Sequence, residues 1–316
     1  MSSPQVITLE QIRTALDSID VCSVMEQAFI AHSNGRSVVP PVGELLIKRE
    51  PPGEVHLKYG YLEGGSHYVV KIASGFPGNP GIGLPPGNGL MILFDLSTGG
   101  ISGILLDEGH LTDVRTAGAG ALASRVLGVP GSRIGIVGTG VQARLQAVHH
   151  ALANGSSEFM VWGRDPGRTS ALASELGDSG LDVEVAPSIE VLADHCRTIV
   201  TCTASSRPLL DASMIRPGTH VTAIGSDTPA KQELDPDVLA AADLVVTDCL
   251  EQSRLRGEVA RSLESGAIAH DRVLELGRIL DRTAIGRTDP DQRTVVDLTG
   301  VAVQDLLIAE AVLRHL

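Results

Sequence analysis

The feature that most constrains this chain is a glycine-containing segment at residues 133–143, which reads Arg-Ile-Gly-Ile-Val-Gly-Thr-Gly-Val-Gln-Ala. It begins with a short apolar run and leads into a segment with helical periodicity, which together predict a strand, a tight turn and a helix. In such a unit Gly138 permits the turn, Gly140 lets the backbone approach a pyrophosphate, and Ala143 allows close packing. The helix N-terminus offers N–H groups and a positive dipole to an anion. An ordinary glycine-rich turn is the alternative interpretation. The predicted dinucleotide loop consists of Gly138, Thr139, Gly140, Val141, Gln142 and Ala143.

Strand and helix patterns alternate through the second half of the chain. Short apolar runs lie at 133–137, 159–162, 183–186, 199–203, 220–224 and 244–247, and helical patterns at 142–154 and 168–176. Such alternation is typical of a parallel sheet covered on both faces. We therefore predict an α/β fold class, with a Rossmann-type doubly wound parallel sheet in residues 121–296.

The first part of the chain has a different pattern. Residues 8–32 predict one or two amphipathic helices, and residues 111–127 an alanine-rich helix. Between them, strand-like runs are separated by Pro and Gly, which is typical of hairpins in a largely antiparallel sheet. These runs are 44–47, 55–61, 68–73, 90–95 and 101–107. We predict a second, α+β domain of residues 1–120 with 297–316, the last stretch being a Thr-Gly turn and a helix.

Composition excludes several classes of partner. The chain has 25 Lys plus Arg against 38 Asp plus Glu, a formal charge of -13, which disfavours nucleic acid because that affinity rests on neutralising phosphates. Its 4 Cys form no C-x-x-C pair, so we predict no disulfide framework and no metal site. No apolar run approaches the roughly 20 residues of a membrane span, and no signal peptide is recognisable. We expect a cytoplasmic protein without a membrane partner.

The predicted strand 159–162 is followed by three residues that bear on the choice of nucleotide. In dinucleotide folds an acidic residue here binds the ribose of NAD, whereas an Arg accommodates the 2′-phosphate of NADP. The chain offers Arg164, aided by Arg168, but also Asp165. We predict that NADP(H) is favoured and that NAD(H) is the alternative.

Several motifs in order along the chain carry a resemblance to a known family. They are Lys-Ile-Ala-Ser-Gly-Phe-Pro-Gly-Asn-Pro at 71–80, Leu-Thr-Asp-Val-Arg-Thr-Ala at 111–117, the glycine loop at 138–143, and Gly-Ser-Asp-Thr-Pro-Ala-Lys-Gln-Glu-Leu-Asp at 225–235. Together they resemble the ornithine cyclodeaminase/mu-crystallin family. This family includes cyclodeaminases, archaeal-type alanine dehydrogenases, and ketimine and iminosuccinate reductases. The resemblance implies a nicotinamide cofactor, hydride transfer at the Cα–N bond of an amino acid, and a homodimer paired through the substrate-binding domain.

The resemblance also assigns roles to individual residues. Lys71 and Arg115 match a cationic clamp for the substrate carboxylate, and Asp227 matches the carboxylate that exchanges a proton with the substrate nitrogen. We expect this clamp to face the nicotinamide, with Asp227 between them. The alternatives are an edge-strand position for Lys71, a buried ion pair of Arg115 with Asp113 or Asp107, and a helix N-cap or Asx-turn for Asp227.

Two further pairs follow from the same resemblance. Ornithine-specific members carry an Arg on an early strand and a Glu on the next, where this chain offers Glu44 and Lys58. A Lys at the second position suits another substrate carboxylate, although Glu44 and Lys58 could instead pair across strands. Thr299 and Gly300 resemble the family segment beside the nicotinamide, with a plain helix start as the alternative.

The resulting hypothesis is an NAD(P)-dependent oxidoreductase acting on a small amino or imino acid. One alternative is ornithine cyclodeaminase, an ammonia-lyase that forms proline and returns the hydride internally. The other is a non-catalytic, NADP-binding protein similar to mu-crystallin.

Overall fold

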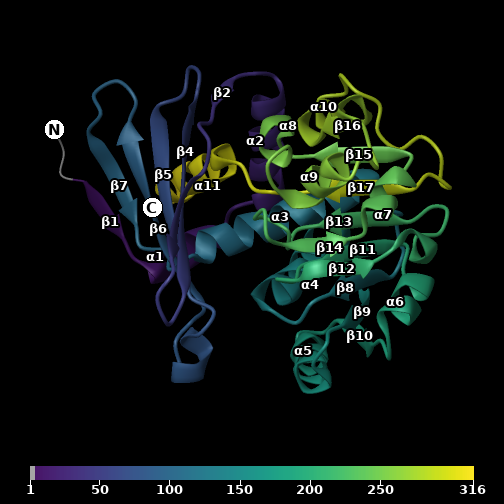
Figure 1. Cartoon of the computed structure of the whole chain (residues 1–316). Helices are drawn as coiled ribbons and strands as arrows, with labels where there is room; N and C mark the ends of the chain where they lie inside the picture. Colours follow the sequence, from purple (N-terminus) through teal and green to yellow (C-terminus); the bar gives the residue numbers. More distant parts are fainter. Residues whose placement is uncertain (1–3) are drawn as a thin grey trace. The chain divides into compact units, whose positions relative to one another are not determined.

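The structure is a computed structural model that describes residues 4–316. The chain divides into two compact units, Met1–Arg115 with Val301–Leu316 and Thr116–Gly300 (Figure 1). The boundary falls inside helix α3 (His110–Leu127), which begins in the first unit and continues in the second. None of the helices in residues 4–316 has the length and apolar character needed to cross a membrane.

The second unit is built on an eight-stranded sheet with the order β10-β9-β8-β11-β13-β17-β15-β16. Every neighbouring pair in it is parallel. Its strands are β8 (Ile134–Val137), β9 (Glu158–Trp162), β10 (Asp182–Val185), β11 (Thr198–Thr201), β13 (His220–Ala223), β15 (Leu244–Thr247), β16 (Val273–Glu275) and β17 (Thr294–Asp297). The order turns back between β8 and β11, and open parallel sheets bind ligands outside the strand ends at such a point. The predicted doubly wound sheet is confirmed.

Helices join and cover the strands of this sheet. They are α4 (Val141–Asn154), α5 (Pro166–Asp178), α6 (Ile189–His195), α7 (Pro236–Ala240), α8 (Leu250–Ser253), α9 (Gly257–Glu264) and α10 (Leu276–Leu280), with 3-10 turns η2 (Ala212–Met214) and η3 (His270–Arg272). Strands such as β8, β11 and β13 are buried along their whole length, as expected when both faces of a parallel sheet are covered.

The sequence did not predict strands β16 and β17 or a second, small sheet of this unit. Strand β17 lies in the middle of the sheet, although Asp297 had been expected to begin a turn and a helix. Its four residues are all buried and show no alternation, so only pairing with β13 and β15 identifies them as a strand. A small sheet of β12 (Ser206–Leu210) and β14 (Gln232–Leu234) was also not predicted.

The first unit contains a seven-stranded sheet, β1-β7-β6-β5-β4-β2, with β3 also paired to β4. Its strands are β1 (Gln5–Ile7), β2 (Ser37–Val38), β3 (Gly43–Ile47), β4 (Gly53–Leu62), β5 (His67–Gly75), β6 (Gly87–Asp95) and β7 (Ile101–Leu105). Only the pair of β1 and β7 is parallel, so the predicted largely antiparallel sheet is confirmed. A 3-10 turn, η1 (Asn79–Ile82), lies in the loop between β5 and β6.

Helices α1 (Leu9–Leu16), α2 (Val21–Ser33) and α11 (Ala302–Arg314) belong to the same unit. The predicted capping box at the start of α1 is present, because Thr8 and Gln11 bond each other's backbone N–H groups. Helix α11 packs on β4, β5 and β6 and against α2. Alternation along the strands puts Lys58, Lys71 and Met91 in one row of this covered face, since they are register partners.

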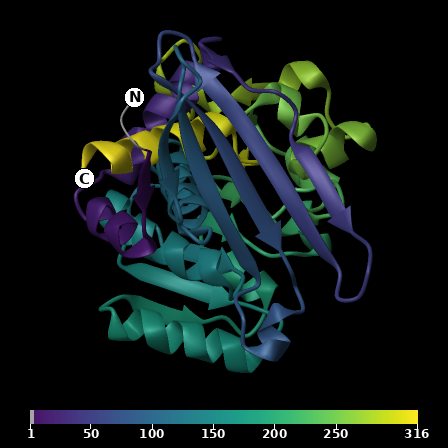
Figure 2. The same ribbon diagram turned by 90° about the vertical axis from the view of Figure 1, so that its left-hand side faces the viewer.

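The opposite face of the sheet is apolar. In Figure 2, which looks onto it, no helix of the described part of this unit crosses β4, β5 or β6. Most of its side chains are aromatic or aliphatic, with Ser74 and Asn88 at one end, and Tyr68 and Phe94 stack with ring centroids 4.7 Å apart. The residues of this open apolar face are Leu57, Tyr59, Tyr61, Tyr68, Val70, Ile72, Leu90, Ile92, Phe94 and Ile104.

Candidate functional site

The glycine loop of the second unit has the geometry of a dinucleotide cradle. Gly138 has φ +142°, and a Cβ there would meet Sγ and the carbonyl oxygen of Cys202. Gly140 is the N-cap of α4 and has no other atom within 4 Å of the place a Cβ would take. Because Gly140 has no side chain, no capping oxygen competes with an anion for the first helical turn. These residues therefore fit the pyrophosphate of a dinucleotide.

The three residues that bear on the choice of nucleotide follow β9 and differ in their contacts. Asp165 is the N-cap of α5, and its Oδ1 accepts a hydrogen bond from the backbone N of Arg168 at 3.0 Å. Arg164 and Arg168 are exposed. One oxygen of Asp165 is thus used in capping the helix, while both guanidinium groups reach solvent.

Thr299 and Gly300 are fixed within the second unit by two other side chains. The carboxylate of Asp248 accepts hydrogen bonds from Thr299 Oγ1 at 2.9 Å and from Gly300 N at 2.6 Å. Gln252 Nε2 donates to Thr299 Oγ1 at 2.8 Å and to the carbonyl oxygen of Gly300 at 2.9 Å. Helix α11 starts directly after these two residues, with Val301 as its N-cap.

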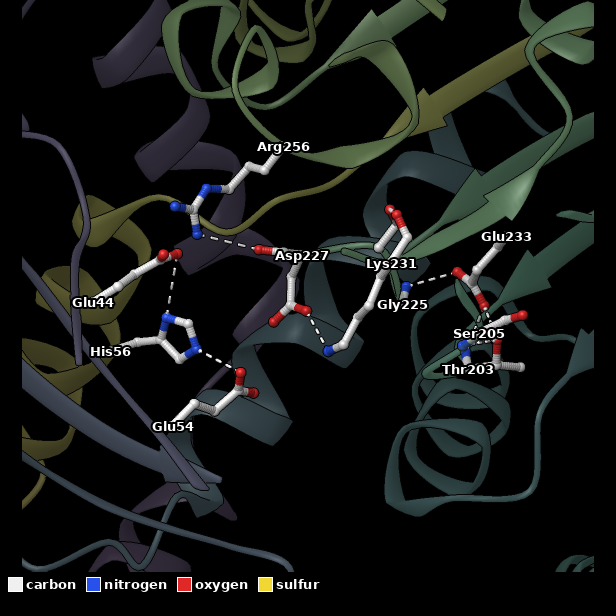
Figure 3. Close-up of polar contacts among 11 residues, drawn as sticks. Glu44, Glu54, His56, Thr203, Ser205, Gly225, Asp227, Lys231, Glu233 and Arg256 are labelled. Carbon is white, nitrogen blue, oxygen red and sulfur yellow. Dashed lines mark hydrogen bonds and ion pairs between the residues drawn. The ribbon is translucent and has the colours of Figure 1, made fainter. Parts of the chain in front are cut away.

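Asp227 lies in the loop that follows β13. Its Oδ1 is 2.6 Å from Lys231 Nζ, and its carbonyl oxygen accepts a hydrogen bond from Arg256 Nη1 at 3.2 Å (Figure 3). The next element along the chain is β14, so the alternative of a helix N-cap is wrong. The Asp227 side chain is 50% exposed, which leaves it accessible to a substrate.

In the first unit Lys71 and Arg115 share one buried counterion. Asp305 Oδ2 lies 2.9 Å from Lys71 Nζ, and Asp305 Oδ1 accepts a hydrogen bond from Arg115 Nε at 3.0 Å. Burial alone would raise the pKa of the Asp305 carboxyl, but the charges of Lys71, Arg115 and Lys58 hold that pKa below its ordinary value. Arg115 is therefore in a buried ion pair, with Asp305 as partner. The edge-strand alternative for Lys71 is wrong, because β5 lies between β4 and β6.

Lys58 belongs to the same cluster, whereas Glu44 faces another residue. Lys58 is the register partner of Lys71 and is 9% exposed. Glu44 is the register partner of His56, with its Oε1 3.8 Å from His56 Nδ1, so Glu44 and Lys58 do not lie directly opposite each other. On its other side His56 Nε2 lies 3.5 Å from Glu54 Oε2 (Figure 3).

Asp107 adds a second buried carboxyl to this cluster. It is 1% exposed, and its Oδ2 accepts a hydrogen bond from the backbone N of Leu111 at 2.9 Å. Its Oδ1 is buried without a hydrogen-bond partner among the described residues. Burial raises the pKa of Asp107, and the charge of Lys71 opposes this rise.

Sequence reasoning did not single out Asp305 or Glu233 for the site. A signal for Asp305 exists, since Gln304 and Asp305 interrupt the otherwise apolar start of α11. Both are buried, and a buried carboxylate requires a cationic or hydrogen-bonding partner. Nothing in the sequence indicated which cations would supply it.

Comparison with known sequences identifies the family. Residues 3–315 match the ornithine cyclodeaminase/mu-crystallin family. The chain belongs to this family. An uncharacterised cyclodeaminase, y4tK, of Sinorhizobium fredii is 38% identical over 98% of this chain and 95% of its own length. The resemblance carried by the motifs is thereby confirmed, and so is the fold.

Solved structures of relatives extend the comparison to the cofactor. An archaeal alanine dehydrogenase dimer with bound NAD is 29% identical, with a TM-score of 0.89 over 99% of this chain and 95% of that one. The iminosuccinate reductase of Paracoccus denitrificans in complex with NAD⁺ is also 29% identical, with a TM-score of 0.89 over 99% of this chain and 96% of that one. An ornithine cyclodeaminase of Agrobacterium fabrum is 30% identical over 76% of this chain and 67% of its own length. Relatives of this chain are thus nicotinamide-dependent oxidoreductases or cyclodeaminases.

Proposed function

We propose that this protein is a nicotinamide-dependent reductase of small 2-imino acids, acting in reverse as an amino-acid dehydrogenase. The observation that carries the proposal is the cluster of Lys58, Lys71 and Arg115 around Asp305. The side chains of Lys58, Lys71 and Arg115 gather around this one carboxylate, and their charges hold its pKa below the ordinary value. Burial lowers the pKa of Lys71 and raises that of Asp107. A cluster richer in cationic than in anionic side chains favours a further anion, which substrate carboxylates would supply.

The charge of the cluster favours a dicarboxylic imino acid. Lys71 and Arg115 would bind the carboxylate at Cα and thereby orient the Cα–N bond, and Lys58 would bind a second carboxylate. Ornithine instead carries a distal ammonium, which Lys58 would repel. The cyclodeaminase alternative is therefore the weaker one for this chain, and the relative named iminosuccinate reductase supports the preferred substrate class.

The reaction divides between the cofactor and this chain. A reduced nicotinamide, when bound, supplies the hydride that reduces a C=N bond. Asp227 would deliver the proton to the substrate nitrogen, and in the reverse direction would remove it. Lys231 lies 2.6 Å from Asp227, and its ammonium stabilises the ionised carboxylate, which is the form that removes the proton in the dehydrogenase direction.

We also propose NADP(H) as the preferred cofactor, with NAD(H) as the alternative. Arg164 and Arg168 are exposed at the end of β9, where a 2′-phosphate lies in dinucleotide folds, and Asp165 caps a helix there. Thr299 and Gly300 remain the proposed contacts of the carboxamide. The alanine dehydrogenase and the iminosuccinate reductase compared above have NAD or NAD⁺ bound, so a preference for NADP(H) would distinguish this chain from them.

One substrate screen tests the proposed function. Oxaloacetate or pyruvate with ammonia would be offered with NADPH and with NADH, and aspartate, alanine and ornithine with NADP⁺ and with NAD⁺. We expect cofactor oxidation that is stoichiometric with amine formation and fastest for the dicarboxylic keto acid. Conversion of ornithine to proline and ammonia without net cofactor change would establish the cyclodeaminase instead. Absence of turnover with every pair would favour a non-catalytic nucleotide-binding protein.

A further inference from the structure

The buried carboxylate of Glu233 lies beneath two loops at the sheet edge where ligands of such folds bind. It belongs to β14 and is 0% exposed. One loop follows β11 and contains Thr203, and the other follows β13 and contains Gly225 and Asp227. The β11 loop borders the point where the strand order turns back, so it forms one wall of the dinucleotide crevice.

Glu233 accepts hydrogen bonds from both loops. Its Oε1 accepts from Thr203 N at 2.5 Å and from Thr203 Oγ1 at 2.8 Å. Its Oε2 accepts from Gly225 N at 2.8 Å and from Thr201 Oγ1 at 2.8 Å. Figure 3 shows the carboxylate between the Thr203 loop and Gly225. Four donors surround its two oxygens, and an amide in place of this carboxyl would turn its NH₂ group toward one of the backbone N–H donors.

The two loops are packed closely enough to move together. A Cβ at Gly225 would overlap the carbonyl oxygen and N of Thr203, and would lie 2.7 Å from Cδ of Glu233. Beyond Gly225, Ser226 Oγ donates to the carbonyl oxygen of Lys231 at 2.9 Å, which closes the turn that carries Asp227. The carboxylate therefore contacts both the β11 loop and the loop that carries Asp227.

Glu233 is itself held by a second buried carboxyl. Glu258 Oε1 accepts from Glu233 N at 2.7 Å, and Glu258 Oε2 accepts from Leu234 N at 3.2 Å. These bonds fix the backbone from which the Glu233 side chain projects. Glu233 is therefore held in place by the start of α9 as well as by strand β14, to which it belongs.

We propose that Glu233 is a positioning residue that fixes the β11 loop for cofactor binding and the β13 loop for proton transfer by Asp227. Only the part concerning Asp227 rests on the proposed function. The role of Glu233 in cofactor binding requires no turnover and is measured on the full chain without substrate.

A matched pair of threonine variants separates this role from general stability. Thr203→Val removes a hydroxyl from the β11 loop that bonds Glu233. Thr201→Val removes an equivalent hydroxyl from strand β11 and leaves the hydrogen bonds from both loops to Glu233 in place. Glu233→Gln is the stronger test, because its amide NH₂ must face one of the loop donors. The readouts are NADPH affinity by fluorescence, hydrogen exchange of peptides covering 202–205 and 224–228, thermal melting, and kcat with the best substrate.

For Glu233→Gln we expect NADPH to bind about tenfold to a hundredfold more weakly, because buried donors are left unsatisfied. Exchange should rise in the two loop peptides but not in peptides of β4 or β5, and kcat should fall as well. Thr203→Val should change affinity and exchange in the same direction by a smaller factor, and Thr201→Val should leave both within about threefold of the parent. The threonine pair decides the question if Glu233→Gln does not fold.

Two results would overturn the proposal. One is parental NADPH affinity and loop exchange in Glu233→Gln with only a lower melting temperature. The other is an equal effect of Thr201→Val and Thr203→Val. If the parent has no reductase activity, the proposed function fails, while affinity and exchange still decide the role of Glu233.

Discussion

Lys58 and Lys71 lie directly opposite each other on the antiparallel strands β4 and β5, and both are buried. Two like charges in register destabilise a sheet unless an anion lies close to them. Asp305, on α11, supplies such an anion to Lys71 and is also stabilised by the charge of Lys58. Three cationic side chains, these two lysines and Arg115, thus gather around one carboxylate, and we expect them to bind the negative charge of a substrate.

Removal of Lys58 should affect one substrate class more than the other. For Lys58→Met we expect the KM for the dicarboxylic imino acid to rise about tenfold to a hundredfold, because an ion pair to its second carboxylate is lost. The KM for the monocarboxylic imino acid should change little. Steady-state kinetics with both substrates measure the difference, and Lys48→Met, at an exposed position beyond β3, is the control. Equal losses with both substrates would contradict the role of Lys58.

Loss of the Asp227 carboxylate should affect chemistry and not cofactor binding. For Asp227→Asn we expect kcat to fall by about 10²–10⁴, the usual contribution of a positioned acid or base. NADPH affinity should stay at the parental value. Asp235→Asn is a matched control, because Asp235 caps α7 and Asn caps a helix equally well. Unchanged turnover in Asp227→Asn would show that another group moves the proton.

Arg164 should determine the preference between the two nicotinamide nucleotides. Arg164→Gln is expected to lower kcat/KM for NADPH about tenfold to a hundredfold while leaving that for NADH nearly unchanged, since only NADPH carries the 2′-phosphate. Arg133→Gln is the control, because Arg133 precedes the N-terminal end of β8, whereas the glycine loop follows its C-terminal end. Arg133 pairs with Glu184 at 2.7 Å. If the parent enzyme prefers NADH, then Asp165 or its surroundings, and not Arg164, determine the nucleotide preference.

The open apolar face of the first unit should be the surface of a homodimer. Contiguous apolar faces are rarely left in water, and an alanine dehydrogenase of this fold is a dimer. We expect the parent to sediment as a dimer and Val70→Glu, in the middle of this face, to shift it to monomer. Leu152→Glu changes an apolar residue of α4 that is 78% exposed and should leave the dimer intact. A monomeric parent would refute the prediction.

Glu258 should make the protein less stable as the pH rises. Burial raises the pKa of this carboxyl from 4.5 to about 7, and the charge of Glu233 adds to the rise. The folded state therefore binds the proton more tightly than the unfolded state, so stability is lost as the pH rises from about 4.5 through 7. The full loss is on the order of 3 kcal/mol for one such group.

Glu258→Gln should flatten this dependence. Urea unfolding at intervals between pH 5 and 8 gives the slope of the unfolding free energy against pH. This slope decides the outcome, and the absolute stability does not, because the amide also loses one of the two backbone hydrogen bonds. Asp297, which is buried and whose pKa is also raised, would leave a residual slope of the same sign. An unchanged slope in Glu258→Gln would assign the pH dependence to other groups.

Much of the fold followed from periodicity and glycine placement. The strand, turn and helix around Gly138 are local, since each depends on residues within a few positions of one another, and they form as predicted. Strand β17 was not predicted because its identity depends on neighbours on both sides that are distant in sequence. The register partner of Glu44, His56, was not predicted for the same reason, since register between strands depends on the whole hairpin.

The sequence by itself determined the α/β class, the dinucleotide loop and the cationic residues Lys71 and Arg115, because short-range pattern and side-chain chemistry carry that information. Only the tertiary structure decided how those charges are balanced. Arg115 on α3 and Asp305 on α11 are separated by 190 positions and meet only in the folded chain. A buried charge is stabilised by the group that folding brings to it, and no local pattern specifies which group that is.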